Sequence, residues 1–359
     1  MMLQFINKII NRLRLFLVKL FESITLRLLV TFTRNQAHII RRSIVEQKGI
    51  KYLDGKTKKI IKQYARQRFG SASYWPWLAL YTEIRGEFIE GWIPADYFRF
   101  KLLPKINPRP SVYLNAQKTY DYRLFGDFAV KPLLLFINGL FYNMDLELVE
   151  KDIVYTFLSE YDDEIVIKEE GGWGGEQVRV INSSDFNVSE LNKWKNYVIQ
   201  PFVRQYKVLN DLYPHSVNTF RVNTFIRKNG CIDVMSVWLR FGGNGRRVDN
   251  LTSGGGYLYF HLNGKPEKMS YNIFTGIEEG DRHKETGYIF SDIEIPMFNK
   301  LLDACITAHK KYTYVRYIGW DVCIDSSGKP KLLEWNSNNP LFTHPDAKFG
   351  PLWYEDEEV

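Results

Sequence analysis

The 359-residue chain predicts an α+β protein that follows a mainly helical N-terminal region. Apolar residues recur at helical spacing over the first 50 residues, short alternating segments between turns begin near residue 116, and a strong hairpin signal lies near the C-terminus. The length allows two or three domains. We expect a basic helical segment over 1–50, a helix-and-loop domain over 51–115, and two α+β parts over 116–200 and 201–359.

The N-terminal segment combines apolar residues at helical spacing with basic side chains. Residues 1–70 carry 16 Lys or Arg and 3 Asp or Glu, a net of +13, whereas 71–359 carries 32 and 38. No apolar run reaches the ~18 uncharged residues that would span a bilayer. The pattern is typical of a helix at an anionic membrane surface, and the alternative is a helix docked on the protein's own core. No nucleic-acid motif accompanies the charge, so we expect no nucleic-acid partner.

Cysteine and histidine usage excludes two classes of site. Cys231, Cys305 and Cys323 are odd in number and far apart, so they predict no disulfide framework. The six histidines lack the spacing of a zinc site. Because no signal-peptide cleavage pattern follows the apolar N-terminal stretch, we expect a cytoplasmic protein.

The middle of the chain contains strand signals around a glycine-rich turn. We expect a strand over 133–137 that ends in the turn Asn138-Gly139, and a helix over 151–158. A strand over 164–168 then runs into the glycine-rich turn, and a strand restarts over 177–181. The turn contains Gly171, Gly172, Gly174 and Gly175. Glycine lets backbone N–H groups approach an anion, and Lys168 would add a cation there; the alternative is a plain glycine hairpin with a solvated lysine.

Three further strands follow. Residues 197–203 form an apolar strand interrupted by Pro201, which predicts an edge strand or a hinge. Its backbone could contact the edge of a purine, but the segment taken by itself favours a plain edge strand. Segments 217–227 and 233–241 alternate in polarity, and Arg240 precedes a flexible glycine loop. Arginine at such a place suits a grip on phosphate or carboxylate, and the alternative is a basic surface hairpin.

The C-terminal hairpin carries the most specific signal. Two β-favouring arms flank residues 326–329, and a two-residue loop at Ser327-Gly328 would place Asp321 directly across from Glu334. Asn336 would then point to the same face. Two carboxylates and an amide oxygen suit Mg²⁺. The alternative is a solvated hairpin with a chance acidic pair, and a three-residue loop would turn Glu334 to the opposite face.

Taken in order, these segments resemble the ATP-grasp superfamily, and most closely its sugar-transfer-associated branch. The resemblance covers roughly 115–345 and implies two α+β subdomains that enclose ATP, with the glycine-rich lid in the smaller one (116–200) and the Mg²⁺ site in the other. The segments that carry it are 165–168 with 171–175, 198–203, 215–221, 239–240, 248–250 with 254–255, 318–321 and 333–336.

The resemblance also implies roles for individual residues. Nucleotide contacts would come from Lys118, Lys168, the glycines of the turn, and Gln200, Pro201, Phe202, Val203 and Gln205. Arg240, Asn250 and Lys168 would lie near the transferred phosphoryl group. Asp321, Glu334 and Asn336 would bind Mg²⁺. Lys118 departs from the usual pattern, because Gln117 stands where an aspartate is common.

The implied reaction is ATP- and Mg²⁺-dependent ligation of a carboxylate to an amine through an acylphosphate. The family's association with sugar transfer suggests a small-molecule or glycan substrate, such as a carboxylated sugar of a cell-surface polysaccharide precursor. Trp238, Tyr257, Tyr259 and Trp335 are candidates for stacking on sugar rings. Two alternatives are a kinase without ligation and a non-catalytic scaffold at the membrane surface.

Overall fold

A computed structural model describes residues 2–171, 177–191, 193–245, 255–272, 277–338, 340 and 343–353, with side chains described from residue 23 onward except at 47 and 48. The chain divides into two compact units. One consists of Met1–Lys105 with Phe342–Val359, and the other of Ile106–Leu341. Residues 343–353 therefore group with the N-terminal unit, although the sequence predicted a C-terminal part over 201–359.

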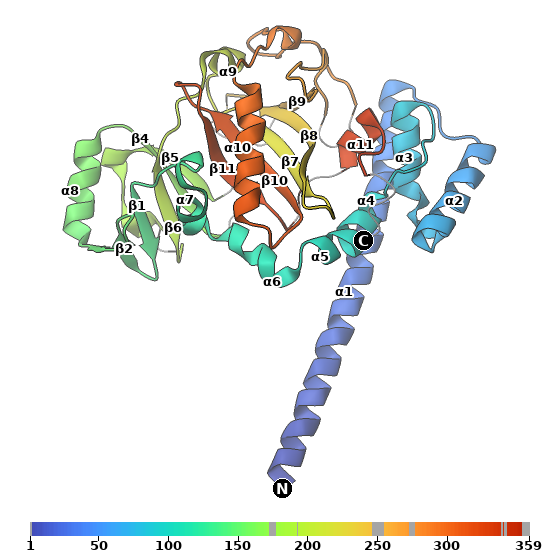
Figure 1. Cartoon of the computed structure of the whole chain (residues 1–359), viewed down its shortest axis with the longest axis horizontal. Helices are drawn as coiled ribbons and strands as arrows, with labels where there is room; N and C mark the ends of the chain where they lie inside the picture. The colour runs from blue at the N-terminus through green and yellow to red at the C-terminus, as the bar shows by residue number, and fades with distance from the viewer. Residues whose placement is uncertain are drawn as a thin grey trace. The chain divides into compact units, whose positions relative to one another are not determined.

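The N-terminal unit is helical (Figure 1). Its helices are α1 (Met2–Lys48), α2 (Gly55–Phe69), α3 (Trp75–Arg85), α4 (Ala95–Tyr97) and α11 (Thr343–Phe349), with a π-helical turn at Phe98–Leu102 that leads into α5 (Leu103–Ile106). Asp54 begins α2 by accepting a hydrogen bond from the Thr57 N–H, and Gly70 ends it in the left-handed conformation. In the described part of the chain, none of the helices is both long enough and apolar enough to cross a membrane.

The second unit contains two antiparallel sheets with short helices between their strands (Figure 1). The six-stranded sheet has the order β3-β2-β1-β6-β4-β5, and the five-stranded sheet has the order β11-β10-β7-β8-β9. The strands are β1 (Leu134–Ile137), β2 (Leu140–Tyr142), β3 (Leu148–Val149), β4 (Glu164–Glu169), β5 (Val178–Asn182), β6 (Tyr197–Pro201), β7 (Thr219–Ile226), β8 (Ile232–Phe241), β9 (Gly256–Phe260), β10 (Tyr317–Ile324) and β11 (Pro330–Asn336). The helices are α6 (Arg109–Val112), α7 (Asp121–Phe125), α8 (Lys151–Tyr161), α9 (Lys207–Leu212) and α10 (Phe298–Lys311).

Several elements of the six-stranded sheet agree with the turn and helix patterns in the sequence. Asn138 and Gly139 have positive φ values of 51° and 86°, which is the backbone of a tight turn between β1 and β2. Helix α8 packs Val154 and Leu158 into the apolar cluster of this sheet. The prediction of an edge strand at 197–203 is wrong, because β6 pairs with β1 on one side and β4 on the other. Pro201 is tolerated there because β1 pairs with β6 only up to Ile199.

The five-stranded sheet has one apolar and one polar face. Helix α10 covers the apolar face, where Phe220, Val222 and Leu239 pack with Leu301 and Cys305 of the helix (Figure 1). Residues at the alternate positions of β7, β8, β10 and β11 point to the opposite face. That face carries the arginines and carboxylates of the candidate site.

Candidate active site

The β10–β11 hairpin does not have the predicted two-residue loop. Ile324 pairs with Pro330, and the Asp325 N–H donates to Lys329 O at 2.9 Å, so Ser326, Ser327 and Gly328 form a three-residue loop. Gly328 has φ +80°, which this type of loop requires at its last position. The predicted register of the outer half of the hairpin, with 325 opposite 330, is therefore wrong by one residue.

A β-bulge corrects this shift before the acidic pair. Val322 pairs with Leu332, but Asp321 pairs with Glu334, so β11 has one extra residue between these two pairs. The expected consequence of a three-residue loop, a Glu334 turned away from Asp321, does not follow. Loop and bulge together keep the two carboxylates directly opposite each other, as the sequence predicted for a different loop.

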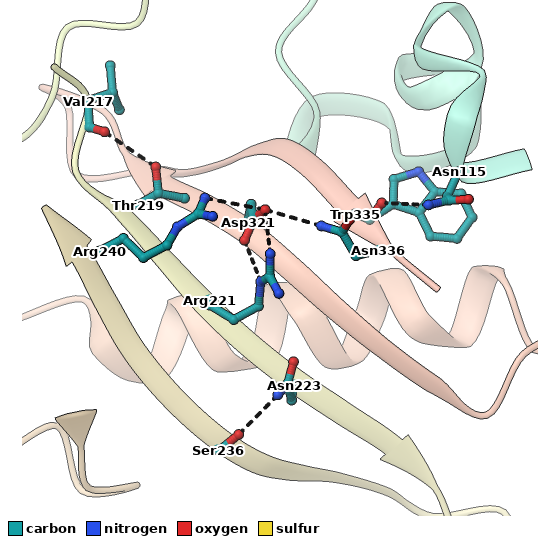
Figure 2. Close-up of polar contacts among 10 residues, drawn as sticks. All are labelled: Asn115, Val217, Thr219, Arg221, Asn223, Ser236, Arg240, Asp321, Trp335 and Asn336. Carbon is teal, nitrogen blue, oxygen red and sulfur yellow. Dashed lines mark hydrogen bonds and ion pairs between the residues drawn. The ribbon is translucent and has the colours of Figure 1, made fainter. Parts of the chain in front are cut away.

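Asp321 of β10 lies between two arginines, one from the adjacent strand β7 and one from β8, the next strand of the sheet (Figure 2). Arg221 of β7 donates to both carboxylate oxygens, with Nε–Oδ1 at 2.5 Å and Nη2–Oδ2 at 2.9 Å. Arg240 of β8 places Nη2 3.4 Å from Oδ2, and Asn336 donates to the same oxygen at 3.2 Å. Burial acts to raise the pKa of Asp321, yet the charges of Arg221 and Arg240 bring it below its usual value, so Asp321 is ionised at neutral pH.

Two lysines from the first half of the unit reach β11. Lys168 at the end of β4 donates from Nζ to the backbone carbonyl of Leu333 at 3.1 Å. Nζ of Lys118 lies 3.9 Å from Oε1 of Glu334. Burial and the charge of Lys118 lower the pKa of Lys168. Burial also raises the pKa of Glu334, against the charge of Lys118 and with the help of Asp321. Lys168 of the six-stranded sheet and Lys118 of the 3₁₀ turn Lys118–Tyr120 thus lie close to the carboxylates of the five-stranded sheet.

Asp121 completes this cluster and was not recognised in the sequence. It begins α7, is buried, and accepts a hydrogen bond from Nε1 of Trp335 at 2.9 Å. Burial raises the pKa of Asp121 to about 7, against that hydrogen bond and the charges of Lys168 and Lys118. No local signal marks Asp121, because the contact joins positions 214 residues apart. Arg221 was also missed as a candidate, although strand alternation places it on the face of Asn223.

The start of the glycine-rich turn is tied to the segment that carries Lys118. The Gly171 N–H donates to Ala116 O at 3.0 Å, and Gly171 has φ +74°. Glu170 accepts a short hydrogen bond from the Thr119 hydroxyl and another from the Asn196 side chain at 2.8 Å. These contacts hold the segment of Lys118 against Glu170 and Gly171.

Three of the residues predicted to contact adenine or ribose make hydrogen bonds within the protein. Gln200 is buried and donates from its side chain to Val130 O at 3.1 Å, and the Phe202 N–H donates to Glu164 O. Gln205 hydrogen bonds with Tyr213, Ser216 and Asn218. Those bonds give Gln205 a clear structural role, and its ribose contact stays a prediction together with the contacts of Pro201 and Val203.

Some predicted residues lie outside the described part of the chain, and others are buried inside the protein. Gly172, Gly174, Gly175 and Asn250 fall outside the described residues. Four aromatic residues considered for sugar stacking are buried, with 3% exposure or less: Trp238, Tyr257, Tyr259 and Trp335. Their rings belong to the protein interior, so the stacking hypothesis is not supported.

The three residues predicted to bind Mg²⁺ have the appropriate donor chemistry. Asp321 is ionised, Glu334 lies opposite it, and Asn336 reaches its Oδ2 from the same face. Because Asn336 now donates its NH₂, it would turn its amide by half a rotation to offer oxygen to an ion. Among the residues described, no group of three or more His, Cys, Asp or Glu side chains could hold a metal ion, and this set itself has two carboxylates and one amide. The set fits a hard cation that keeps water or phosphate oxygens as its other ligands.

Comparison with known proteins identifies the family. A model of the sugar-transfer-associated ATP-grasp family matches residues 97–346. The chain belongs to this family. Its fold is therefore the ATP-grasp fold, with the helical region before it, and ATP and Mg²⁺ are the cofactors typical of this fold. No curated protein is significantly similar to the chain in sequence.

Several solved ATP-grasp structures are distantly similar to this family member. The ligase PsnB, in complex with a precursor variant, Mg and ADP, shares 15% identity over 67% of this chain and 59% of its own, with a TM-score of 0.35. D-alanyl-alanine synthetase A from Vibrio cholerae shares 8% over 68% of this chain and 61% of its own, with a TM-score of 0.39. A biotin carboxylase domain from Hydrogenobacter thermophilus shares 9% over 65% and 41%, with a TM-score of 0.40. This chain thus spans less than two thirds of each of these proteins.

Proposed function

We propose that this protein is an ATP- and Mg²⁺-dependent carboxylate–amine ligase. A carboxylate oxygen of the substrate attacks the γ-phosphorus of ATP, and the bond to the bridging oxygen breaks to release ADP. An amine then attacks the acyl carbon of the resulting acylphosphate, phosphate leaves with the C–O bond electrons, and the nitrogen loses a proton. The family of this chain supports an ATP-dependent reaction of this kind, which ends in an amide bond.

One observation carries this proposal. Asp321 and Glu334 lie opposite each other on β10 and β11, at the point where Lys118 and Lys168 reach β11. Two carboxylates this close repel each other unless a cation lies between them. The lysines and Arg240 place positive charge beside that position. A site of this composition is suited to a triphosphate bound with a divalent cation.

Each group of the chain has a defined task in the proposed reaction. Lys168 and Lys118 bind phosphate oxygens and hold the triphosphate against the carboxylates. Arg240 offsets the negative charge that the transferred phosphoryl group shares with the attacking carboxylate. Arg221 orients Asp321 with two hydrogen bonds and keeps it ionised. Mg²⁺ bound by Asp321, Glu334 and Asn336 would supply further neutralisation of the phosphate charge.

We propose a carboxylated sugar or an amino acid on a cell-surface polysaccharide precursor as the substrate. The family description, which associates these proteins with sugar transfer, supports this choice. We also propose that the protein works in the cytoplasm, at the inner face of the cell membrane, where lipid-linked precursors are accessible. The net charge of +13 on residues 1–70 supports this location.

A hydroxylamine trap tests the reaction. The full chain is incubated with ATP, Mg²⁺ and a panel of uronic acids and amino acids, and hydroxylamine captures any activated acyl group as a hydroxamate. ADP release is measured in parallel. Glu334→Gln serves as the inactive variant. Glu190→Gln, which changes an exposed carboxylate in a surface ion pair, serves as the matched control.

The products separate the alternatives. A hydroxamate that depends on ATP, Mg²⁺ and Glu334 supports the ligase. ADP release with a phosphorylated alcohol and without hydroxamate would identify a kinase instead. Absence of ADP release with every acid, together with failure of the chain to bind ATP, would favour the non-catalytic scaffold.

A further inference from the structure

Helix α1 docks on its own unit with one side. Ala37 and Ile44 are fully buried on this side. Arg41 donates two hydrogen bonds to Glu83 of α3, both at 2.6 Å, and Arg34 pairs with Asp96 of α4 at 2.7 Å. Buried, hydrogen-bonded ion pairs fix the rotation of α1 about its axis, so its outward side is defined over this part of the helix.

The outward side of α1 carries a row of large apolar side chains, with the exposed polar residues Asn35 and Arg42 among them. Large side chains exposed to solvent follow each other at helical spacing: Ile24 at 50%, Leu28 at 66%, Phe32 at 60% and Ile39 at 67%. These positions lie on the side opposite Ala37 and Ile44 at 100° per residue. In the sequence, Ile6, Ile10, Leu13 and Leu17 continue the same spacing toward the N-terminus. A row of exposed large apolar residues marks an interaction surface.

Helix α2 of the same unit presents a basic side. It buries Ile61 and Ala65 and exposes a row of cations at spacings of three or four residues, Lys56, Lys59, Lys62 and Arg66. The helix itself contains no acidic residue, since Asp54 is its N-cap. The two helices meet around Trp75, whose ring centroid lies 4.9 Å from Cζ of Arg41 of α1 and 5.2 Å from Nζ of Lys62 of α2.

We infer that the apolar row of α1 and the basic row of α2 both bind lipid at the surface of an anionic bilayer. This inference specifies the membrane contact of the proposed function and rests on it for the choice of leaflet. Exposed apolar side chains suit the acyl region of such a bilayer, and a row of cations suits its anionic headgroups. Nucleic acid would use the cations but leave the row of leucine, isoleucine and phenylalanine unburied.

The charge of α1 disfavours a second copy of the chain as the partner. The helix carries nine basic residues and two acidic ones, Glu22 and Glu46. Paired copies of a helix gain specificity from opposite charges beside the apolar seam, and two copies of α1 would bring mainly like charges together. An anionic lipid surface complements this charge instead.

Vesicle sedimentation tests the surface with the full chain. Vesicles of phosphatidylcholine alone are compared with vesicles containing 30% phosphatidylglycerol, chosen as about a third anionic lipid. Leu28→Ser with Phe32→Ser alters the apolar row, and Lys59→Glu with Arg66→Glu alters the basic row. Lys131→Glu with Lys310→Glu changes the same charge at exposed positions of the other unit and serves as the control.

We expect the wild type to bind the anionic vesicles and to bind neutral vesicles weakly. Each lysine or arginine near an anionic surface raises the partition coefficient by a factor of about five. The double reversal on α2 should therefore lower this coefficient at least ~25-fold. The α1 double variant should lower it at least ~10-fold. The control variant should bind as the wild type does, and circular dichroism should show that all variants keep their helices.

Several results would overturn the inference. One is equal binding to neutral and anionic vesicles, and another is an α2 variant that binds as well as the Lys131/Lys310 control. A dimer in light scattering that dissociates on Leu28→Ser with Phe32→Ser, without vesicle binding, would assign the apolar row to a second copy. Hydroxamate formation from a soluble acid is measured on every variant. A variant that loses vesicle binding but keeps this turnover separates the membrane contact from the ligase chemistry.

Discussion

Two isosteric substitutions in the acidic pair should both abolish Mg²⁺-dependent ADP release but differ in their effect on stability. Asp321→Asn removes a negative charge that two arginines share, and Arg221 and Asp321 have side chains only 6% and 3% exposed. Breaking a buried ion pair costs about 3–5 kcal/mol because the remaining charge stays buried. For a unit of this size each kcal/mol lowers the Tm by about 2–4 °C, so the expected decrease is about 10 °C.

Glu334→Gln should leave stability almost unchanged. The Glu334 side chain is 36% exposed, and Lys118 is 3.9 Å away, so the pair contributes less than about 1 kcal/mol. Burial and Asp321 already raise the pKa of Glu334, so loss of its charge also relieves repulsion. Thermal unfolding followed by circular dichroism, without Mg²⁺, measures both variants.

ADP release from ATP in saturating Mg²⁺ measures the catalytic effect of the two variants. The wild type and Glu190→Gln should be indistinguishable in both assays. The reasoning is refuted if either variant of the acidic pair retains full turnover. It is also refuted if Glu334→Gln lowers the Tm as much as Asp321→Asn does. The ion pairs of Asp321 with Arg221 and Arg240 would then not give Asp321 a larger contribution to stability than Glu334.

Two further predictions concern the residues around β11. Lys168→Met should weaken binding of a non-hydrolysable ATP analogue by roughly 10–100-fold in calorimetry, because a charge-assisted hydrogen bond to phosphate contributes about 1.5–3 kcal/mol; an unchanged Kd would exclude Lys168 from the nucleotide site. Burial raises the pKa of Asp121 from 3.8 to about 7, so between these values the folded state binds more protons than the unfolded state, and stability falls as the pH rises. Asp121→Asn should therefore match the wild type at pH 4 and exceed its unfolding free energy by up to about 4 kcal/mol at pH 8 in urea denaturation; an equal difference at both pH values would contradict this pKa.

Much of this fold follows from short-range patterns. Asn138-Gly139 predicts the turn between β1 and β2, and the alternating segments 217–227 and 233–241 predict β7 and β8, which the structure contains with ends shifted by one or two residues. The strand at Tyr197–Pro201 was recognised, but its place in the sheet was not. A proline disfavours a central strand only where its nitrogen faces a partner, and that depends on where β1 ends.

For the acidic pair, too, some features follow from the sequence and others only from the tertiary structure. The sequence by itself determined that two β arms join through a serine- and glycine-containing turn, with Asp321 and Glu334 at matching distances from it. Only the tertiary structure decided the three-residue loop and the compensating bulge, because register depends on how both strands pack their apolar residues against α10. It also decided that Arg221, Lys168 and Asp121 meet this hairpin, since contacts between residues 100 or more positions apart leave no mark on local residue preferences.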